Sequence, residues 1–162
     1  MTLQPADEGN EGDAAWLLSP GERNLLIALF SRPPEPRDTP RLSRASADLE
    51  AQGLEDLADE LARHRQALRS RVTAILDAAT PVEAGPQTDG PGWILRLTPD
   101  DRETFLQSLN EIRLGAWERL GRPDPPEMPP GLSPDAPELF HWATLEIASR
   151  FQGRLLSGIF PE

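Results

Sequence analysis

Three short runs combine a capping residue, a proline and an acidic residue, and they constrain the fold more than any other feature of this sequence. Residues 19–22 read Ser-Pro-Gly-Glu, and residues 98–101 read Thr-Pro-Asp-Asp. Residues 133–138 read Ser-Pro-Asp-Ala-Pro-Glu, which contains two overlapping versions of the pattern. A hydroxyl before the first turn, a proline in that turn and an acid three residues after the hydroxyl are typical of helix starts. Each run therefore predicts the beginning of a helix.

The prolines are concentrated between these elements. The chain has 18 prolines in 162 residues, about twice the usual share of about 5%. Most of them lie in residues 32–40, 81–91 and 122–137. Because proline fixes φ and lacks an N–H donor, these three segments are interpreted as loops.

Apolar residues at spacings of three and four predict four helices, over about residues 20–32, 46–79, 99–120 and 137–159. The second helix has the longest apolar stripe. Its members are Leu54, Leu57, Leu61, Leu68, Val72, Ile75 and Leu76. The apolar runs Ala15–Leu18 and Trp93–Leu97 are too short for helices, and they are expected to pair as two strands.

The predicted fold class is mainly α, with four main helices in a compact bundle and a minor two-stranded β element. Residues 14–162 are interpreted as a single helical domain. Each expected strand leads through a similar capping run into a helix, which raises the hypothesis of two strand–helix–helix halves. Residues 1–13 are polar and acidic, and they are predicted to be a disordered tail because they can bury little apolar surface.

Charge and cysteine content exclude several functions. The net charge of −11 opposes direct binding to nucleic acid and to anionic membranes. The chain has no cysteine, which removes thiol catalysis and disulfides. The beginning of the sequence lacks the features of a secretory signal, and no apolar run approaches the roughly 18 residues of a membrane span. A cytoplasmic location is expected.

The sequence contains no recognisable catalytic or metal-binding arrangement. Of the two histidines, His64 lies on the apolar stripe of the second helix and is expected at a helix seam. His141 follows Glu138 by three residues, but no second such pair exists to complete a carboxylate-bundle metal site. No phosphate-binding loop or nucleophile elbow is present. We expect no enzyme activity, cofactor or metal.

Asn110 and Arg113 are a pair of polar residues for which the sequence allows two interpretations, a structural role or ligand binding. They lie one turn apart on the third expected helix, beside Leu106 and Trp117. Polar groups next to an apolar face need partners. Asn110 is therefore expected to bond backbone and Arg113 to meet a carboxylate, both in the service of the fold. The alternative is that the two residues bind a ligand.

The segment around Arg113 resembles a known bacterial family. Residues 109–114 (Leu-Asn-Glu-Ile-Arg-Leu) and 118–121 (Glu-Arg-Leu-Gly) are similar to its "LN-x-x-RL … RLG" signature, and residues 22–26 are similar to its "ER-x-LL" element. Residues 140–155 resemble its closing helix. This AosR-like family has long had no assigned function, and its genes typically neighbour that of the ClpS protease adaptor. On this resemblance Glu22, Arg23, Asn110, Arg113 and Leu114 are family-motif residues with structural roles.

The same family includes an oxidative-stress transcriptional regulator that associates with a sigma factor after forming a disulfide. This chain cannot use that switch, because it has no cysteine. The sequence and the resemblance together predict a non-enzymatic regulatory or interaction protein that acts through protein partners, with stress-linked transcription as its setting. The alternative is a small-molecule binding module or an enzyme centred on Arg113 and Asn110.

Overall fold

The fold is mainly α, as predicted. The computed structural model describes residues 4–5, 14–33, 47–83, 90–124 and 127–157, and helices make up 67% of the described residues. The helices are α1 (Pro20–Ser31), α2 (Ala47–Asp77), α3 (Pro99–Arg119) and α4 (Pro137–Ser157). The strands are β1 (Gln4–Pro5), β2 (Ala14–Leu18), β3 (Thr80–Val82) and β4 (Gly92–Leu97). The four predicted helices are thus confirmed, with ends within a few residues of those expected.

The capping runs begin helices as expected. At the start of α1, the N–H of Glu22 donates to the Ser19 hydroxyl, and the N–H of Ser19 donates to the Glu22 carboxylate. Thr98 and Asp101 make the same reciprocal pair at the start of α3. Each box satisfies N–H groups that have no partner inside the helix.

The two predicted strands pair with each other, but the sheet is larger than expected. β2 and β4 are antiparallel, with Trp16 opposite Leu95, and the full strand order is β1-β2-β4-β3. The interpretation of residues 81–91 as a loop was wrong at its start, because β3 includes Pro81. The outer position of β3 explains this result, since an edge strand tolerates a residue without an N–H donor.

Part of the predicted disordered tail lies in the sheet. Gln4 and Pro5 pair with Ala15 and Ala14 as strand β1. The other residues of the 1–13 segment, and the expected end of the fourth helix beyond Ser157, lie outside the described residues.

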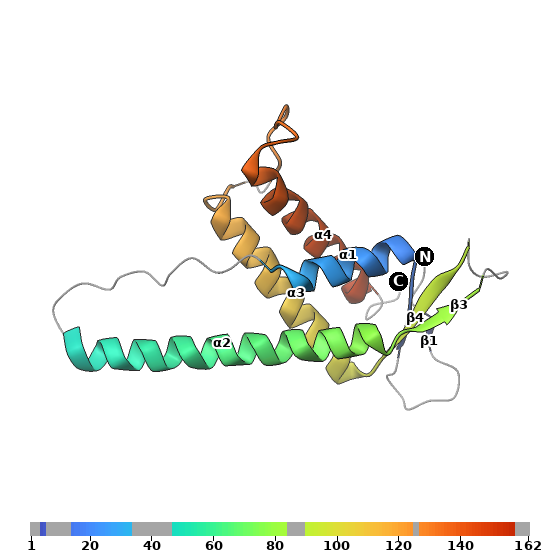
Figure 1. The fold of residues 1–162 in the computed structure, drawn as a ribbon, viewed down its shortest axis with the longest axis horizontal. Helices are drawn as coiled ribbons and strands as arrows, with labels where there is room; N and C mark the ends of the chain where they lie inside the picture. Colours follow the sequence, from blue (N-terminus) through green and yellow to red (C-terminus); the bar gives the residue numbers. More distant parts are fainter. Residues whose placement is uncertain (1–3, 6–13, 34–46, 84–89, 125–126, 158–162) are drawn as a thin grey trace.

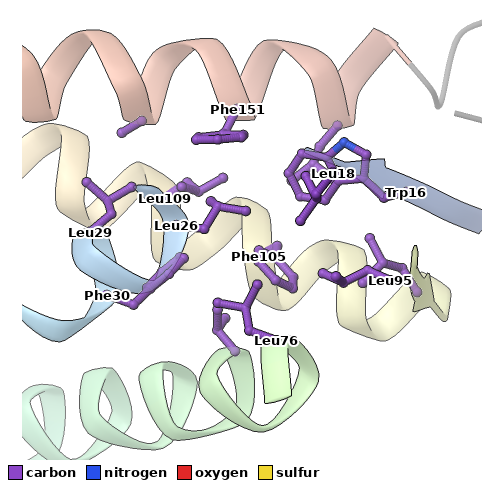
Figure 2. Packing of buried hydrophobic residues seen from close by; sticks show 14 of the residues in the cluster. Trp16, Leu18, Leu26, Leu29, Phe30, Leu76, Leu95, Phe105, Leu109 and Phe151 are labelled. Carbon is purple, nitrogen blue, oxygen red and sulfur yellow. The ribbon is translucent and has the colours of Figure 1, made fainter. Parts of the chain in front are cut away.

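The core lies where α1, α3, α4 and the end of α2 meet the sheet. Trp16 contacts Phe105 and Phe151 edge to face, with ring centroids 6.0 Å and 5.7 Å apart (Figure 2). Phe30 meets Phe105 in the same way at 6.0 Å. Edge-to-face pairs of this kind add to the stabilisation from burial, so Phe105 of α3 links the sheet to the helices.

Helix α2 is only partly covered by the other elements. Val72 and Leu76 near its end are buried, whereas Leu57 is 54% exposed and Leu61 is 42% exposed. In Figure 1 the amino-terminal half of α2 projects past α1 and α3. His64 is also exposed, so the prediction that it lies at a helix seam is wrong.

Candidate functional site

Asn110 and Arg113 bond to each other rather than to the partners expected for them. Arg113 Nη2 donates to Asn110 Oδ1 over 2.9 Å. No carboxylate in the described part of the chain lies within salt-bridge distance of Arg113, so the prediction of a carboxylate partner is wrong. Arg113 Nε is buried and has no hydrogen-bond partner. This guanidinium therefore keeps a donor for which the fold provides no acceptor.

Arg113 lies at a groove between α3 and α4, with a volume of about 650 Å³. Helix α3 contributes Arg113, Leu114 and Trp117. The remaining lining residues come from α4 and the segment before it: Trp142, Leu145, Glu146, Ser149, Glu127 and Met128. Most of the wall is therefore apolar, with one guanidinium and two carboxylates among the lining side chains.

Local backbone geometry holds Trp117 at the groove. Gly121 has φ 82° and Arg122 has φ 61°, so the chain reverses directly after α3. This reversal lets Trp117 Nε1 donate to the carbonyl of Pro123 over 3.0 Å. Arg122 lies 5.8 Å from the Trp117 ring and pairs with Glu118. The indole is thus fixed by its polar edge, while part of its ring surface faces the groove.

A second, small apolar cluster lies beside the groove. Ala116, Trp142 and Leu145 are buried in it, and Leu120 and Leu132 pack against them. Trp142 is part of this cluster and Trp117 packs against it, so both tryptophans are held by well-packed neighbours. A rigid base of this kind reduces the ordering cost of binding.

Glu22 and Arg23, the other family-motif residues, do not line the groove. Glu22 closes the α1 capping box and forms an ion pair with Arg154 of α4. Arg23 Nη2 donates to the carbonyl of Leu76 over 3.2 Å, and its guanidinium lies 4.2 Å from the Trp93 ring. Through these contacts Glu22 links α1 to α4, and Arg23 links α1 to α2 and β4.

Two carboxyl groups in the described part of the chain, those of Glu22 and Asp101, have shifted pKa values. Desolvation alone would raise the pKa of Glu22, but hydrogen bonds from Ser19 and the charge of Arg154 outweigh it, and the pKa is lowered from its ordinary value of 4.5. The pKa of Asp101 is likewise lowered, because hydrogen bonds from Thr98 and Arg71 outweigh desolvation. Both groups stabilise the fold in the ionised form.

Leu114 has a different position from the one its motif suggested. It is 42% exposed and lines the groove, so it does not lie at a packing position. Sequence reasoning also missed Trp142, Met128 and Glu146 as members of a site. No motif or spacing marked these three residues as members of a site, because the linear sequence does not indicate which face of α4 packs against α3.

Neither a metal site nor a membrane-spanning helix is found in the described part of the chain. Among the described residues, no group of three or more histidine or acidic side chains could hold a metal ion. No helix in the same part of the chain is long and apolar enough to cross a membrane. No protein-family model, curated protein or solved structure matches this chain. The groove beside Arg113 is therefore the feature on which a functional conclusion can rest.

Proposed function

We propose that this protein is a non-enzymatic interaction protein that binds a protein partner in the groove between α3 and α4. The observation that supports the proposal is the groove of about 650 Å³, whose lining combines apolar side chains, including Trp117 and Trp142, with the side chain of Arg113. Tryptophan and arginine are among the residue types that most often dominate binding energy at protein interfaces.

The lining chemistry favours a particular kind of segment in the partner. The apolar wall suits one or two large apolar side chains, which gain from leaving water. Glu127 and Glu146 favour a basic residue next to them. The guanidinium of Arg113, a lining side chain with several N–H donors, suits a main-chain carbonyl of the bound segment. The partner's segment is thus apolar and basic, in keeping with the net charge of −11 on this chain.

The family resemblance supplies a cellular setting for the proposal. It favours a regulator of stress-linked transcription that acts by contacting another protein. Because the chain has no cysteine, its binding would be set by partner availability or by another signal rather than by a disulfide.

Synthetic peptides test the proposal directly. Peptides of about ten residues that place leucine or phenylalanine beside arginine are titrated into the full-length protein, and tryptophan fluorescence is followed. We expect a saturable change in the wild type and at least about a tenfold weaker affinity in Leu114→Glu. The matched control is Leu156→Glu, which changes an equally exposed leucine of α4 outside the groove lining.

A small-molecule ligand is the second candidate, because a cavity of about 650 Å³ is also in the range of ligand pockets. Apolar carboxylic acids are the appropriate probes, since Arg113 could pair with a carboxylate. If such acids bind with Arg113-dependent affinity while no peptide does, the protein-partner proposal is wrong and the small-molecule candidate replaces it. If neither class perturbs the fluorescence, the groove has neither function.

A further inference from the structure

The groove between α3 and α4 contains a methionine that is open to solvent. Met128 lies in the segment that joins the two helices, and it lines the groove together with Leu114 and Trp117. It is 55% exposed, so solutes in water reach it without any opening of the fold. A methionine in this position is accessible both to a bound partner and to dissolved reagents.

The chain makes fixed contacts on both sides of Met128. On the α3 side, the indole N–H of Trp117 donates to the carbonyl of Pro123. On the α4 side, Leu132 packs against the apolar cluster that contains Trp142. A chemical change in the Met128 side chain therefore acts at the groove rather than on a distant surface.

Met128 is also the only sulfur-containing residue of the chain apart from Met1, because the sequence has two methionines and no cysteine. Hydrogen peroxide oxidises a thioether by transferring one oxygen atom to the sulfur. The sulfur lone pair attacks a peroxide oxygen, the O–O bond breaks, and the departing hydroxide takes the remaining proton to form water. The sulfur is oxidised to the sulfoxide and the peroxide is reduced. Methionine sulfoxide reductases reverse the change, with one enzyme for each epimer of the sulfoxide.

We propose that Met128 is a site of reversible oxidation that regulates the groove, and that its sulfoxide weakens binding of the partner's apolar segment. This inference rests on the proposed function of the groove. The thioether suits apolar side chains of the partner. The sulfoxide is polar, and a partner that covers it without giving it a hydrogen bond loses the free energy of its hydration. Trp117 does not satisfy the sulfoxide, because its N–H already donates to Pro123.

The expected effect is a loss of affinity of about tenfold, which corresponds to about 1.4 kcal/mol. A loss of this size is within the cost of covering a polar group that has no hydrogen bond. A hydrogen bond from Arg113, which also lines the groove, would not restore the affinity. The donor would then be taken from the main-chain carbonyl of the partner.

Peptide titrations of the full-length protein before and after oxidation test the inference. The protein is treated with hydrogen peroxide until mass spectrometry shows one added oxygen on Met128. Peptides that place leucine or phenylalanine beside arginine are then titrated while tryptophan fluorescence is followed. We expect about a tenfold weaker affinity after oxidation, and recovery after treatment with methionine sulfoxide reductases for both epimers. The melting temperature should not change, because Met128 is exposed.

Two variants of Met128 separate its oxidation from other effects. Met128→Leu keeps an apolar side chain of similar size. It should bind the peptides as the wild type does and keep its affinity after peroxide treatment, although Met1 is still open to oxidation. Met128→Gln places a polar amide at the same position, so it should bind about tenfold more weakly without any peroxide.

The outcomes distinguish this inference from the proposed function. If the untreated wild type binds the peptides and the oxidised protein binds them equally well, the inference is wrong and the proposed function stands. The inference also fails if peroxide weakens Met128→Leu as much as the wild type, or if the oxidised wild type melts at a lower temperature, because the loss then has another origin. If the untreated wild type binds no peptide, the proposed function fails, and the regulatory role of Met128 fails with it.

Discussion

At the scale of single residues, Glu22 combines an interaction that the sequence predicts with one that it does not. Its capping contact to Ser19 is local, and the spacing of the two residues predicted it. Its ion pair with Arg154 joins residues 132 positions apart, which no local pattern can indicate. The pair is partly buried, since each side chain is 25% exposed, so it is screened less by salt than a surface pair.

Glu22→Gln should lower the free energy of unfolding by about 1–2 kcal/mol at neutral pH, because glutamine keeps the shape but loses the charge. The pKa of Glu22 is lowered in the folded state, so its contribution is present above its ordinary value of 4.5 and is lost as pH falls through the folded pKa. The difference between wild type and variant should therefore shrink below about pH 4.5. Urea unfolding over pH 3–7 measures it.

The same titration needs a matched control at an exposed carboxylate. Glu60→Gln changes a residue whose side chain is 64% exposed and whose ion pair is within one helix. Its effect at neutral pH should stay within about 0.5 kcal/mol. A pH-independent difference between Glu22→Gln and wild type would contradict the role assigned to the Glu22 charge.

Arg23 and Arg113 should differ in their importance for stability. Arg23 bonds the carbonyl of Leu76 and stacks on Trp93, so Arg23→Met should lower the free energy of unfolding by about 2 kcal/mol. Among the described residues, Arg113 bonds the Asn110 side chain alone, and Arg113→Met should cost less than about 1 kcal/mol. Thermal melting of the two variants side by side checks this order. If Arg113→Met lowers the stability more than Arg23→Met does, the role of Arg113 is structural.

At the scale of helices and strands, the sequence predicts those features that depend on interactions between residues close together in the chain. The beginnings of α1 and α3 follow from hydroxyl, proline and acid within four residues, and these starts are confirmed. The pairing of β2 with β4 was also predictable, because a lone strand leaves its backbone groups unpaired. Strand β3 was missed because Pro81 lies in a proline-rich segment, and only its edge position makes a strand possible there.

The groove between α3 and α4 could not be predicted from the sequence, and the reason is physical. Its walls depend on which faces of α3 and α4 pack together, and this choice involves residues far apart in the chain. The apolar period of a helix indicates a buried face, but not where a neighbouring helix stops covering it. Leu57 and Leu61 illustrate the same point, because their spacing matches that of buried Val72 and Leu76 on the same helix.

The two capping boxes should each contribute measurably to stability. Ser19→Ala and Thr98→Ala remove the side-chain acceptor at the starts of α1 and α3, and each should lower the free energy of unfolding by about 1 kcal/mol. Ser157→Ala is the control, because its hydroxyl donates to a carbonyl within the last turn of α4 and it caps no N-terminus. Changes of similar size in all three variants would show that the caps have no special role.

At the scale of the whole molecule, three arginines of α2 form ion pairs with carboxylates inside the molecule. Arg63 pairs with Glu60, Arg65 lies near Glu111, and Arg71 bonds Asp101 over 2.9 Å. These partners lie on α2 and on two separate turns of α3. These ion pairs leave no concentrated basic surface on α2, and the net charge of −11 opposes the approach of phosphates.

The purified protein should therefore not bind DNA by itself, even if its role is transcriptional. Binding to a duplex requires several phosphate contacts from a concentrated basic surface, and each released counterion makes that binding sensitive to salt. Fluorescence anisotropy with random and promoter-like duplexes at about 0.1 M salt is the measurement. We expect no saturable signal up to about 10 µM protein. Micromolar binding that weakens steeply with added salt would contradict this view of the surface and would place direct DNA contact among the functions of the protein.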